Sequence, residues 1–195
     1  MNNAKNTIGW CDKTFNPVTG CLHGCWYCYA RKIAMRFDGH FKPTFHEDRL
    51  KEPYKLKKPS KIFVCSMADL FGDWVPRYWI GKILKVIKEN PRHTFQLLTK
   101  NPKRYLEFKF SDNVWLGITE DYINQARLNY LKMAKTKYKF ISFEPLLGDM
   151  SALDLSGIDL CIVGAMTGAR AVKPKQEWID GIKHPNIFYK NNLLK

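Results

Sequence analysis

The sequence predicts an α/β protein built as an open, partial parallel β/α barrel of about six strands. Two observations carry this prediction: short β-rich runs alternate with stretches of helical character, and the 195-residue chain is shorter than the roughly 250 residues of a complete eight-fold barrel. A hydrophobic content of 45% is enough for a sizeable core. We therefore expect one domain that spans residues 1–195.

The expected strands begin with residues 14–18. Each later run is apolar and rich in β-branched or aromatic residues, as buried strands are. These later runs are residues 61–66, 94–99, 114–119, 139–143, 159–164 and 186–189. Because helical stretches separate most of the runs, the strands are expected to be parallel, with right-handed crossovers.

Three expected helices lie between the strands, at residues 76–90, 121–135 and 174–182. The first begins with Pro76, and Ile80, Ile83 and Ile87 fall on one face at helical spacing. The basic segment 38–59 contains three prolines and is longer than an ordinary connection. We expect it either to face the substrate as a lid or to pack on the surface through its aromatic residues.

The charge balance is strongly basic, with 32 Lys and Arg residues, 18 Asp and Glu residues and a net charge of +14. This favours polyanionic partners, usually nucleic acid, although a solvated lysine surface or an acidic redox partner would also account for it. No apolar run approaches the roughly 20 residues that span a bilayer, and the first residues lack the apolar core of a signal peptide. We expect a cytoplasmic monomer with no membrane contact.

Three of the six cysteines, Cys21, Cys25 and Cys28, lie within eight residues in a C-x3-C-x2-C pattern. Crowded cysteines in an intracellular chain favour a metal site over disulfides. A closed zinc site needs a fourth ligand, which would have to be His23, His40 or His46. Three thiolates on an iron–sulfur cubane leave one iron without a protein ligand, and an open iron is a site for chemistry.

The cysteine pattern, with Tyr27 just before its last cysteine, resembles the cluster motif of the radical S-adenosylmethionine (radical SAM) superfamily. The chain also resembles a phage-associated radical SAM family with no assigned substrate. The segments that carry this resemblance are residues 12–21, 28–30, 64–71, 97–104, 114–119 and 142–148. Two features depart from that family: residues 164–168 are Gly-Ala-Met-Thr-Gly where Gly-Gly-Glu-Ser-Gly is typical, and the C-terminal tail is short.

The resemblance implies a radical-SAM-like barrel with a 4Fe–4S cluster held by Cys21, Cys25 and Cys28, and S-adenosyl-L-methionine as the second cofactor. An electron from an external flavodoxin- or ferredoxin-like donor would cleave S-adenosylmethionine to methionine and a 5′-deoxyadenosyl radical, which would abstract hydrogen from a substrate. The resemblance also implies the cofactor contacts: Tyr27 against the adenine, Ser66 and Asp69 at the methionyl amino group, Thr119 and Glu120 at the ribose hydroxyls, and Gly164 at the adenine edge.

Two further polar residues follow expected strands, where the reactive groups of parallel α/β proteins gather. Lys100 could neutralise the methionyl carboxylate or a substrate anion. Glu144, as a buried carboxylate, would need a partner, for which Lys100 is a candidate. We expect both to be catalytic. By contrast, Asp121 and Thr167 are expected to be helix caps or turn formers.

The other three cysteines have weaker claims to a role. Cys65 and Cys161 lie inside apolar runs and are expected to be buried and inert. Cys11 is expected to be an incidental thiol, with a hydrogen-atom donor or a second ligand as the alternatives.

Three functions fit the sequence. The first is a radical SAM enzyme that acts on a nucleic acid or nucleotide, favoured by the cysteine pattern together with the +14 charge. The second is the same chemistry on a small molecule or a partner protein, which also suits a compact chain. The third is a zinc-stabilised nucleic-acid-binding module, which the polar residues after the strands disfavour because such a module does not need them.

Overall fold

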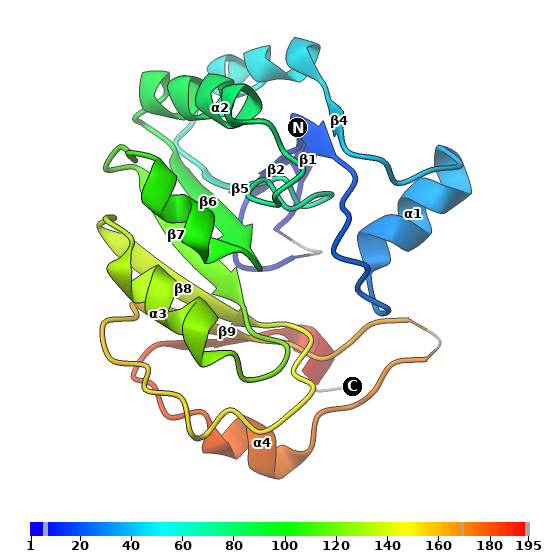
Figure 1. The fold of residues 1–195 in the computed structure, drawn as a ribbon, viewed down its shortest axis with the longest axis vertical. Coiled ribbons are helices and arrows are strands. Elements are labelled where there is room, and N and C mark those ends of the chain that lie inside the picture. Colours follow the sequence, from blue (N-terminus) through cyan, green and yellow to red (C-terminus); the bar gives the residue numbers. More distant parts are fainter. Residues whose placement is uncertain (6–7, 169, 194–195) are drawn as a thin grey trace.

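The computed structural model describes residues 1–5, 8–168 and 170–193. Across these residues the main sheet has eight strands in the order β1-β2-β5-β6-β7-β8-β9-β10, and it curls into half of a barrel (Figure 1). β1 pairs antiparallel with β2, and every other neighbouring pair is parallel. The prediction of an α/β, partial parallel barrel is confirmed. The strands are β1 (Asn2–Asn3), β2 (Lys13–Phe15), β5 (Lys61–Val64), β6 (Thr94–Thr99), β7 (Val114–Thr119), β8 (Tyr138–Phe143), β9 (Leu160–Val163) and β10 (Ile187–Tyr189).

Every expected β-rich run contains a strand, and the runs 94–99 and 114–119 coincide with β6 and β7 at both ends. The run 14–18 is divided, because Val18 begins β3 (Val18–Thr19), which pairs with β4 (Thr44–Phe45) in a separate two-stranded sheet. The main sheet is wider than the six strands expected. All seven expected runs contribute a strand to this sheet, and the N-terminal residues, which carry no strand pattern, add β1 at its edge through pairing with β2.

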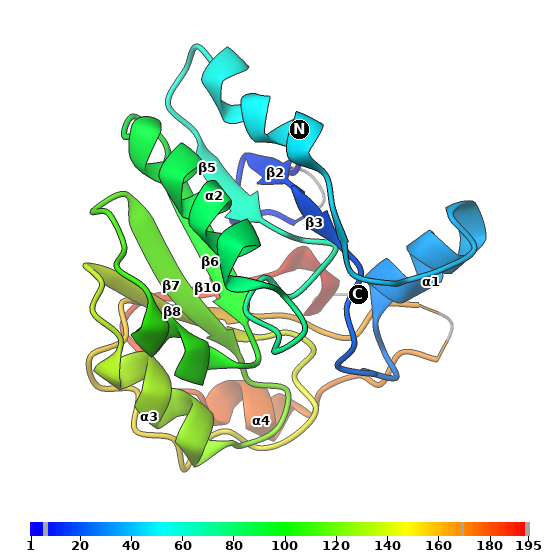
Figure 2. The same ribbon diagram turned by 45° about the horizontal axis from the view of Figure 1, so that its top comes forward.

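The three expected helices form as α2 (Arg77–Glu89), α3 (Gln125–Met133) and α4 (Gln176–Gly181), and they cover the outer face of the curled sheet (Figure 1). The isoleucines predicted on one face of α2 are buried. A fourth helix, α1 (Tyr29–Phe37), stands away from the sheet in both ribbon views (Figures 1 and 2). Among the described residues, no helix is long and apolar enough to cross a membrane. The 3-10 helices are η1 (Glu47–Lys51), η2 (Pro53–Lys55), η3 (Pro102–Glu107) and η4 (Asn191–Leu193).

The segment 38–59 packs largely on the surface, which was one of the two expectations. Phe45 stacks on Trp79 of α2 with ring centroids 5.3 Å apart, and the Tyr54 hydroxyl bonds the Glu89 carboxylate at the end of that helix. Phe41, at the start of the segment, instead lines the central cavity described below. Most of the segment therefore supports the outer layer rather than covering the barrel mouth.

The sheet separates two apolar clusters. The larger cluster lies between the strands and the outer helices, and it includes Ile83 and Phe95. The smaller cluster fills the concave side, where Trp10 packs on Phe63 and Phe140 with ring centroids 4.7 and 5.8 Å apart. Side chains alternate between the two faces along each strand, so both faces of a strand such as β6 are buried.

Two glycines let the concave cluster close. A Cβ atom on Gly117 of β7 would lie 2.4–2.5 Å from the ring of Phe140, so only glycine leaves room for that ring. Gly9 has a φ of +89°, and a Cβ atom there would lie 3.1 Å from the ring of Phe188 on β10. The N-terminal segment therefore reaches from the β1–β2 edge of the sheet to the β10 edge, and Trp10 forms the floor of the open half-barrel.

Candidate functional site

A cavity of about 660 Å³ opens on the concave side at the carboxyl ends of the strands. Its floor is apolar, with Trp10, Phe63 and Leu98, and its rim carries polar side chains that follow several strands. This is the end of a parallel barrel where function is usually found. Of the residues predicted for the site, nine line this cavity: Cys21, Cys25, Tyr27, Cys28, Ser66, Asp69, Lys100, Thr119 and Glu144.

The cysteine loop, residues 21–28, connects β3 to α1 and forms one wall of the cavity. Its entry is fixed at Gly20, whose φ is +84° and where a Cβ atom would lie 2.1 Å from the Lys42 carbonyl oxygen. Its exit is fixed at Cys28, which caps α1: the Arg31 amide donates to the Cys28 Sγ at 3.3 Å, and the Cys28 amide donates to the Cys25 carbonyl at 3.2 Å. Three thiols therefore face one cavity from a tightly anchored loop.

The electrostatics of this loop favour a cationic ligand. Burial is the main cause that raises the pKa of the Cys21 thiol to about 11; a backbone hydrogen bond at His23 opposes the rise, and the nearby charges of Asp69, Cys25 and Cys28 add to it. Three thiolates in one place repel one another, and a positive metal centre would reverse that repulsion. The described residues hold no group of three His, Cys, Asp or Glu side chains already gathered at metal-ligand spacing. The donor set suits an iron–sulfur cluster, and the loop would have to close around it.

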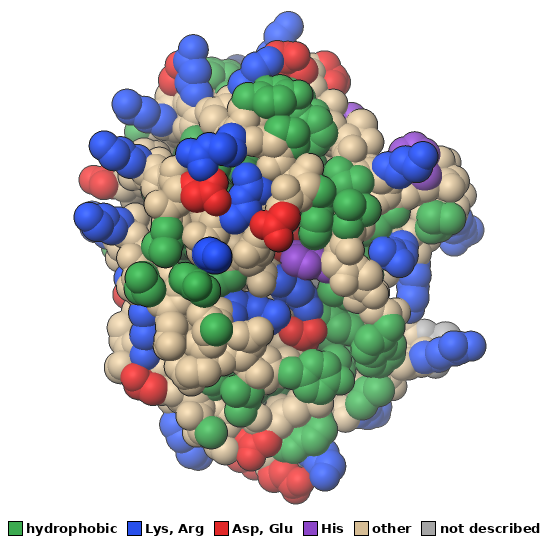
Figure 3. Space-filling model, in the orientation of Figure 1, with side chains coloured by type: hydrophobic (Ala, Val, Ile, Leu, Met, Phe, Trp, Pro, Cys, Tyr) green, Lys and Arg blue, Asp and Glu red, His purple; other side chains and the backbone are tan. Residues whose placement is uncertain are grey.

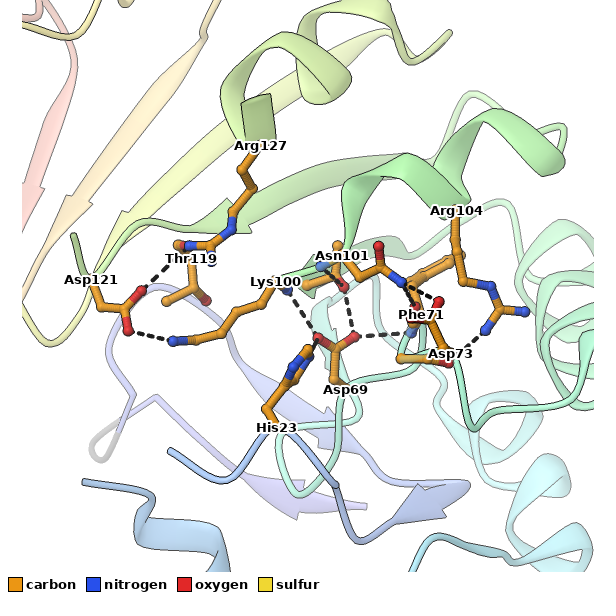
Figure 4. A network of polar contacts seen from close by, with 12 residues as sticks. His23, Asp69, Phe71, Asp73, Lys100, Asn101, Arg104, Thr119, Asp121 and Arg127 are labelled. Carbon is orange, nitrogen blue, oxygen red and sulfur yellow. Dashed lines mark hydrogen bonds and ion pairs between the residues drawn. The ribbon is translucent and has the colours of Figure 1, made fainter. Parts of the chain in front are cut away.

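Asp69 ties this loop to the strand ends (Figure 4). Its Oδ2 atom lies 2.7 Å from the His23 Nε2 and accepts from the Lys100 amide at 2.9 Å, while its Oδ1 accepts from the Thr99 hydroxyl at 2.6 Å and the Phe71 amide at 2.9 Å. Burial alone would raise the pKa of this carboxyl, but these hydrogen bonds outweigh it and lower the pKa. Asp69 therefore anchors His23 and hence the cysteine loop, a partnership that the sequence did not reveal.

Lys100 is engaged by Asp121, whereas the sequence had suggested Glu144 (Figure 4). The Lys100 Nζ lies 2.5 Å from the Asp121 Oδ2, which also accepts from the Tyr27 hydroxyl at 2.7 Å. Burial would raise the pKa of Asp121, but the bonds from Lys100 and Tyr27 outweigh it and lower the pKa. Of the two roles expected for Asp121, the helix cap is wrong, because Asn124 caps α3, while Asp121 lies in the bend that follows β7. Lys100, Asp121 and Tyr27 therefore form a triad, which the sequence did not reveal because these residues lie far apart along the chain.

A smaller cavity of about 320 Å³ lies against the same wall and is lined by Cys25, Tyr27, Lys100 and Arg127, among others. The Arg127 Nη1 lies 3.3 Å from the Asp121 Oδ1, but its Nε is buried without a hydrogen-bond partner in the described part of the chain. A buried donor of this kind needs an acceptor. Arg127 is therefore a residue of this wall that the sequence analysis missed, and its guanidinium already faces the carboxylates of Glu120 and Asp121.

Thr119 lines the main cavity, whereas Glu120 does not. The Glu120 side chain is fully buried and lies 3.4 Å from the Arg127 Nη1. Burial raises the pKa of this carboxyl to about 7, with Asp121 raising it further and Arg127 opposing the rise. Since successive residues of a strand point to opposite faces, Thr119 and Glu120 do not share one side of the sheet. Of the two predicted ribose contacts, only Thr119 stands where a ligand in the cavity would meet it.

The opposite wall carries Glu144, and its partner is Lys190 at the end of β10 rather than Lys100. Both side chains line the cavity, and the ammonium group donates to the Glu144 Oε1. Gly164 does not line the cavity, but it makes room for the pair, because a Cβ atom there would lie 3.0 Å from Lys190 and 3.1 Å from Glu144. Lys100, Glu144 and Lys190 therefore all line the cavity as members of ion pairs, whereas Asp121, the partner of Lys100, lines only the smaller cavity.

The remaining predictions concern single residues. Ser66 lines the cavity and its hydroxyl donates to the Asn16 Oδ1 at 3.1 Å. Cys65 and Cys161 are buried as expected, and burial raises the pKa of each thiol to about 12. Cys11 is buried too, beside the Phe63 backbone, and its thiol pKa is also raised to about 12 by burial. All three are therefore protonated thiols at neutral pH.

Comparisons with known proteins give one match. Residues 5–187 match the sequence profile of a family described as a protein of unknown function, DUF5131. Neither the curated proteins nor the solved structures contain a match to the chain. Because the match covers nearly the whole chain, the protein belongs to the DUF5131 family.

Proposed function

We propose that the protein is a radical SAM enzyme that acts on a nucleic acid or nucleotide. The single observation that carries this proposal is the C-x3-C-x2-C loop, whose three thiols face a cavity at the carboxyl ends of a parallel half-barrel. When bound there, a 4Fe–4S cluster with one open iron would pass an electron from a flavodoxin- or ferredoxin-like donor to S-adenosylmethionine, whose reductive cleavage gives methionine and a 5′-deoxyadenosyl radical.

The cavity suits such a ligand in size and lining. Its volume of about 660 Å³ lies within the roughly 300–1,000 Å³ typical of small-molecule sites. The rings of Trp10 and Phe63 on its floor would exclude water, and a reactive radical requires that exclusion. The hydroxyl groups of Ser66 and Thr119 stand on the rim, where they would bind the polar groups of the nucleoside.

The two ion pairs would orient the charged ends of the ligand. An amino acid end such as that of S-adenosylmethionine carries one ammonium and one carboxylate. Lys100, which lines the cavity, would attract the carboxylate, while Asp121, whose pKa is lowered by its bonds from Lys100 and Tyr27, would balance the charge. Glu144 and Lys190 on the facing wall are then left to position the substrate, and Lys100 and Glu144 are the two residues we assign to catalysis.

Iron fits this loop better than zinc does. A closed zinc site would need a histidine as fourth ligand, but the His23 Nε2 is hydrogen-bonded to Asp69 and the His46 Nε2 lies 2.8 Å from the Thr19 hydroxyl. Zinc bound through His23 or His46 would have to break that histidine's contact, and only the exposed His40 would leave both contacts in place. An open iron requires no fourth protein ligand, so the existing contacts can remain.

The test is anaerobic reconstitution with iron and sulfide, followed by reduction in the presence of S-adenosylmethionine and an assay for 5′-deoxyadenosine. Cys25→Ala is expected to abolish both the cluster absorbance and deoxyadenosine formation. Cys161→Ala, which changes a buried thiol on β9 outside the cavity, is the matched control and should retain both. Stoichiometric zinc with no bound iron would overturn the proposal.

A further inference from the structure

Two segments flank the mouth of the cavity, and we call them the two arms. The first arm is α1, and the second is the segment that follows β9, residues 165–168 and 170–175. Residues of each arm line the cavity, Ile33 in the first and Met166 in the second. The arms also approach each other, because a Cβ atom on Gly168 would lie 3.3 Å from the Lys32 Nζ. Both ribbon views show the second arm extending beneath α1 (Figures 1 and 2).

The two arms are the most one-sidedly charged part of the cavity surroundings. Neither residues 29–37 nor residues 165–175 contain an Asp or Glu, although the chain as a whole has 18. Blue side chains accordingly stand along this projecting edge in the space-filling view (Figure 3). The exposed basic residues of the arms are Arg31, Lys32, Arg36, Arg170, Lys173 and Lys175.

The first arm also exposes apolar side chains that no other element covers. α1 buries only Ala30 and Ala34, while Phe37 is 74% exposed and Met35 is 53% exposed. The Arg36 guanidinium lies 5.5 Å from the centre of the Phe37 ring. Exposed rings interleaved with cations are the surface on which unpaired bases stack beside a neutralised phosphate backbone.

The cavity limits what such a polyanion can insert. Its volume of about 660 Å³ has to hold S-adenosylmethionine as well as the reacting group, which leaves room for a single unit of a polymer. A paired base would first have to leave its duplex, at an unstacking cost that an unpaired base does not have. We propose that the two arms bind the backbone of a single-stranded nucleic acid and admit one nucleotide to the cavity. This inference rests on the proposed function and names its substrate and docking surface.

An acidic electron carrier is the other partner that a basic surface would attract. Such a carrier needs to approach only the cysteine loop, and the charges of the second arm would not contribute to its binding. Positive charge on both sides of the cavity mouth instead matches a chain that passes across it. The observations therefore favour the nucleic acid.

The test measures the binding of fluorescently labelled oligothymidylate to the protein as purified, without added iron or sulfide, over a range of salt concentrations. The triple variant K32Q/R36Q/K173Q removes charge from both arms. Each phosphate contact with a single strand contributes about 0.7 to the slope of log K against log salt, so the slope should shrink by about 2 and affinity should fall on the order of 100-fold near 0.1 M salt. A matched duplex should bind more weakly than the single strand.

The control is K88Q/K109Q/K135Q, which removes the same charge from exposed lysines that precede β6, β7 and β8, at the amino ends of the strands. Its slope and affinity should stay close to those of the unchanged protein. Equal losses in both triple variants, or a loss in neither, would overturn the inference. The inference would also be overturned if oligothymidylate does not bind while an acidic flavodoxin binds in a way that depends on the charges of both arms.

This outcome is separable from that of the proposed function. Binding is measured without reductant or S-adenosylmethionine, whereas deoxyadenosine formation is measured without nucleic acid. If the proposed function fails, the difference between the two triple variants can still be observed. If the docking surface fails, deoxyadenosine can still form.

Discussion

Helices α1 and α2 both follow early strands of the half-barrel, but they have opposite relations to the core. α2 buries Ile80, Ile83, Val86 and Ile87 against the sheet. α1 buries two alanines and leaves larger apolar side chains exposed, among them Phe37. The outer layer of the molecule therefore provides stability, while α1 and the cavity mouth leave apolar and charged surface free for a ligand.

The same contrast holds for polar groups. The outer cluster is apolar, whereas the cavity wall holds the charged groups of Asp69 and Lys100 largely away from bulk water. Burying a charge costs free energy unless it is paired and hydrogen-bonded. A sheet end built only for stability would not need such groups, and this is why we take the cavity as the candidate functional site.

The largest expected effect compares an isoleucine from each helix. Ile83→Ala should lower the free energy of unfolding by about 2–5 kcal/mol, because it leaves a cavity in the outer cluster. Ile33→Ala should change it by less than about 0.5 kcal/mol, because Ile33 is 45% exposed. Urea denaturation of both variants checks this. Similar losses in the two would show that α1 is as much a part of the core as α2.

The second effect concerns pH. The folded-state pKa of Glu120 is about 7, above the roughly 4.3 of an unfolded glutamate. The folded protein therefore holds this proton more tightly than the unfolded chain does. The resulting contribution to the free energy of unfolding is fully present below about pH 4 and is lost as the pH rises through about 7. Glu120→Gln removes this dependence. Relative to the unchanged protein, the variant should gain up to about 3 kcal/mol between roughly pH 4 and 8. Parallel stability curves would show that Glu120 is ionised throughout.

The third effect breaks the ion pair on the far wall of the cavity. Lys190→Met leaves the Glu144 carboxylate without its ammonium partner and should cost about 1–2 kcal/mol of unfolding free energy. Adding Glu144→Gln should recover part of that loss, because the unpaired charge is then gone. Chemical denaturation of both single variants and the double variant measures the coupling, and strictly additive losses would contradict the pairing.

The smallest effect on stability is expected from Phe37→Ala, which removes a ring that is 74% exposed. The free energy of unfolding should change by less than about 0.5 kcal/mol. Affinity for oligothymidylate should nevertheless fall roughly tenfold through lost stacking, with the salt slope unchanged. Tyr78→Ala on α2, where the ring is 63% exposed, is the control and should leave affinity unchanged. Equal affinity for both variants would remove Phe37 from the docking surface.

Local sequence was sufficient for most of the fold. The runs 94–99 and 114–119 were placed at both ends because most of their residues are apolar, aromatic or β-branched and polar residues follow them. The strand count was less accurate, since β1 is only two residues long and becomes a strand through pairing with β2. Edge strands of this kind carry little pattern of their own.

The candidate site was predictable in its members but not in their pairing. Spacing alone singled out Cys21, Cys25 and Cys28, because metal-binding loops bring ligands together within a few residues. The partners of Lys100 and Glu144 were not predictable, since Asp121 and Lys190 lie 21 and 46 positions away along the chain. Both pairings became visible only in the structure, where the ends of neighbouring strands come together.

The sequence by itself determined the half-barrel, the cysteine loop and the basic charge, because each follows from residue types at short range. Only the tertiary structure decided which charges face one another, that Glu120 lies outside the cavity and that α1 is left uncovered. The physical reason is that these properties depend on how parallel strands align across the sheet and on what remains unburied after the core has packed. Neither quantity is a property of any single segment.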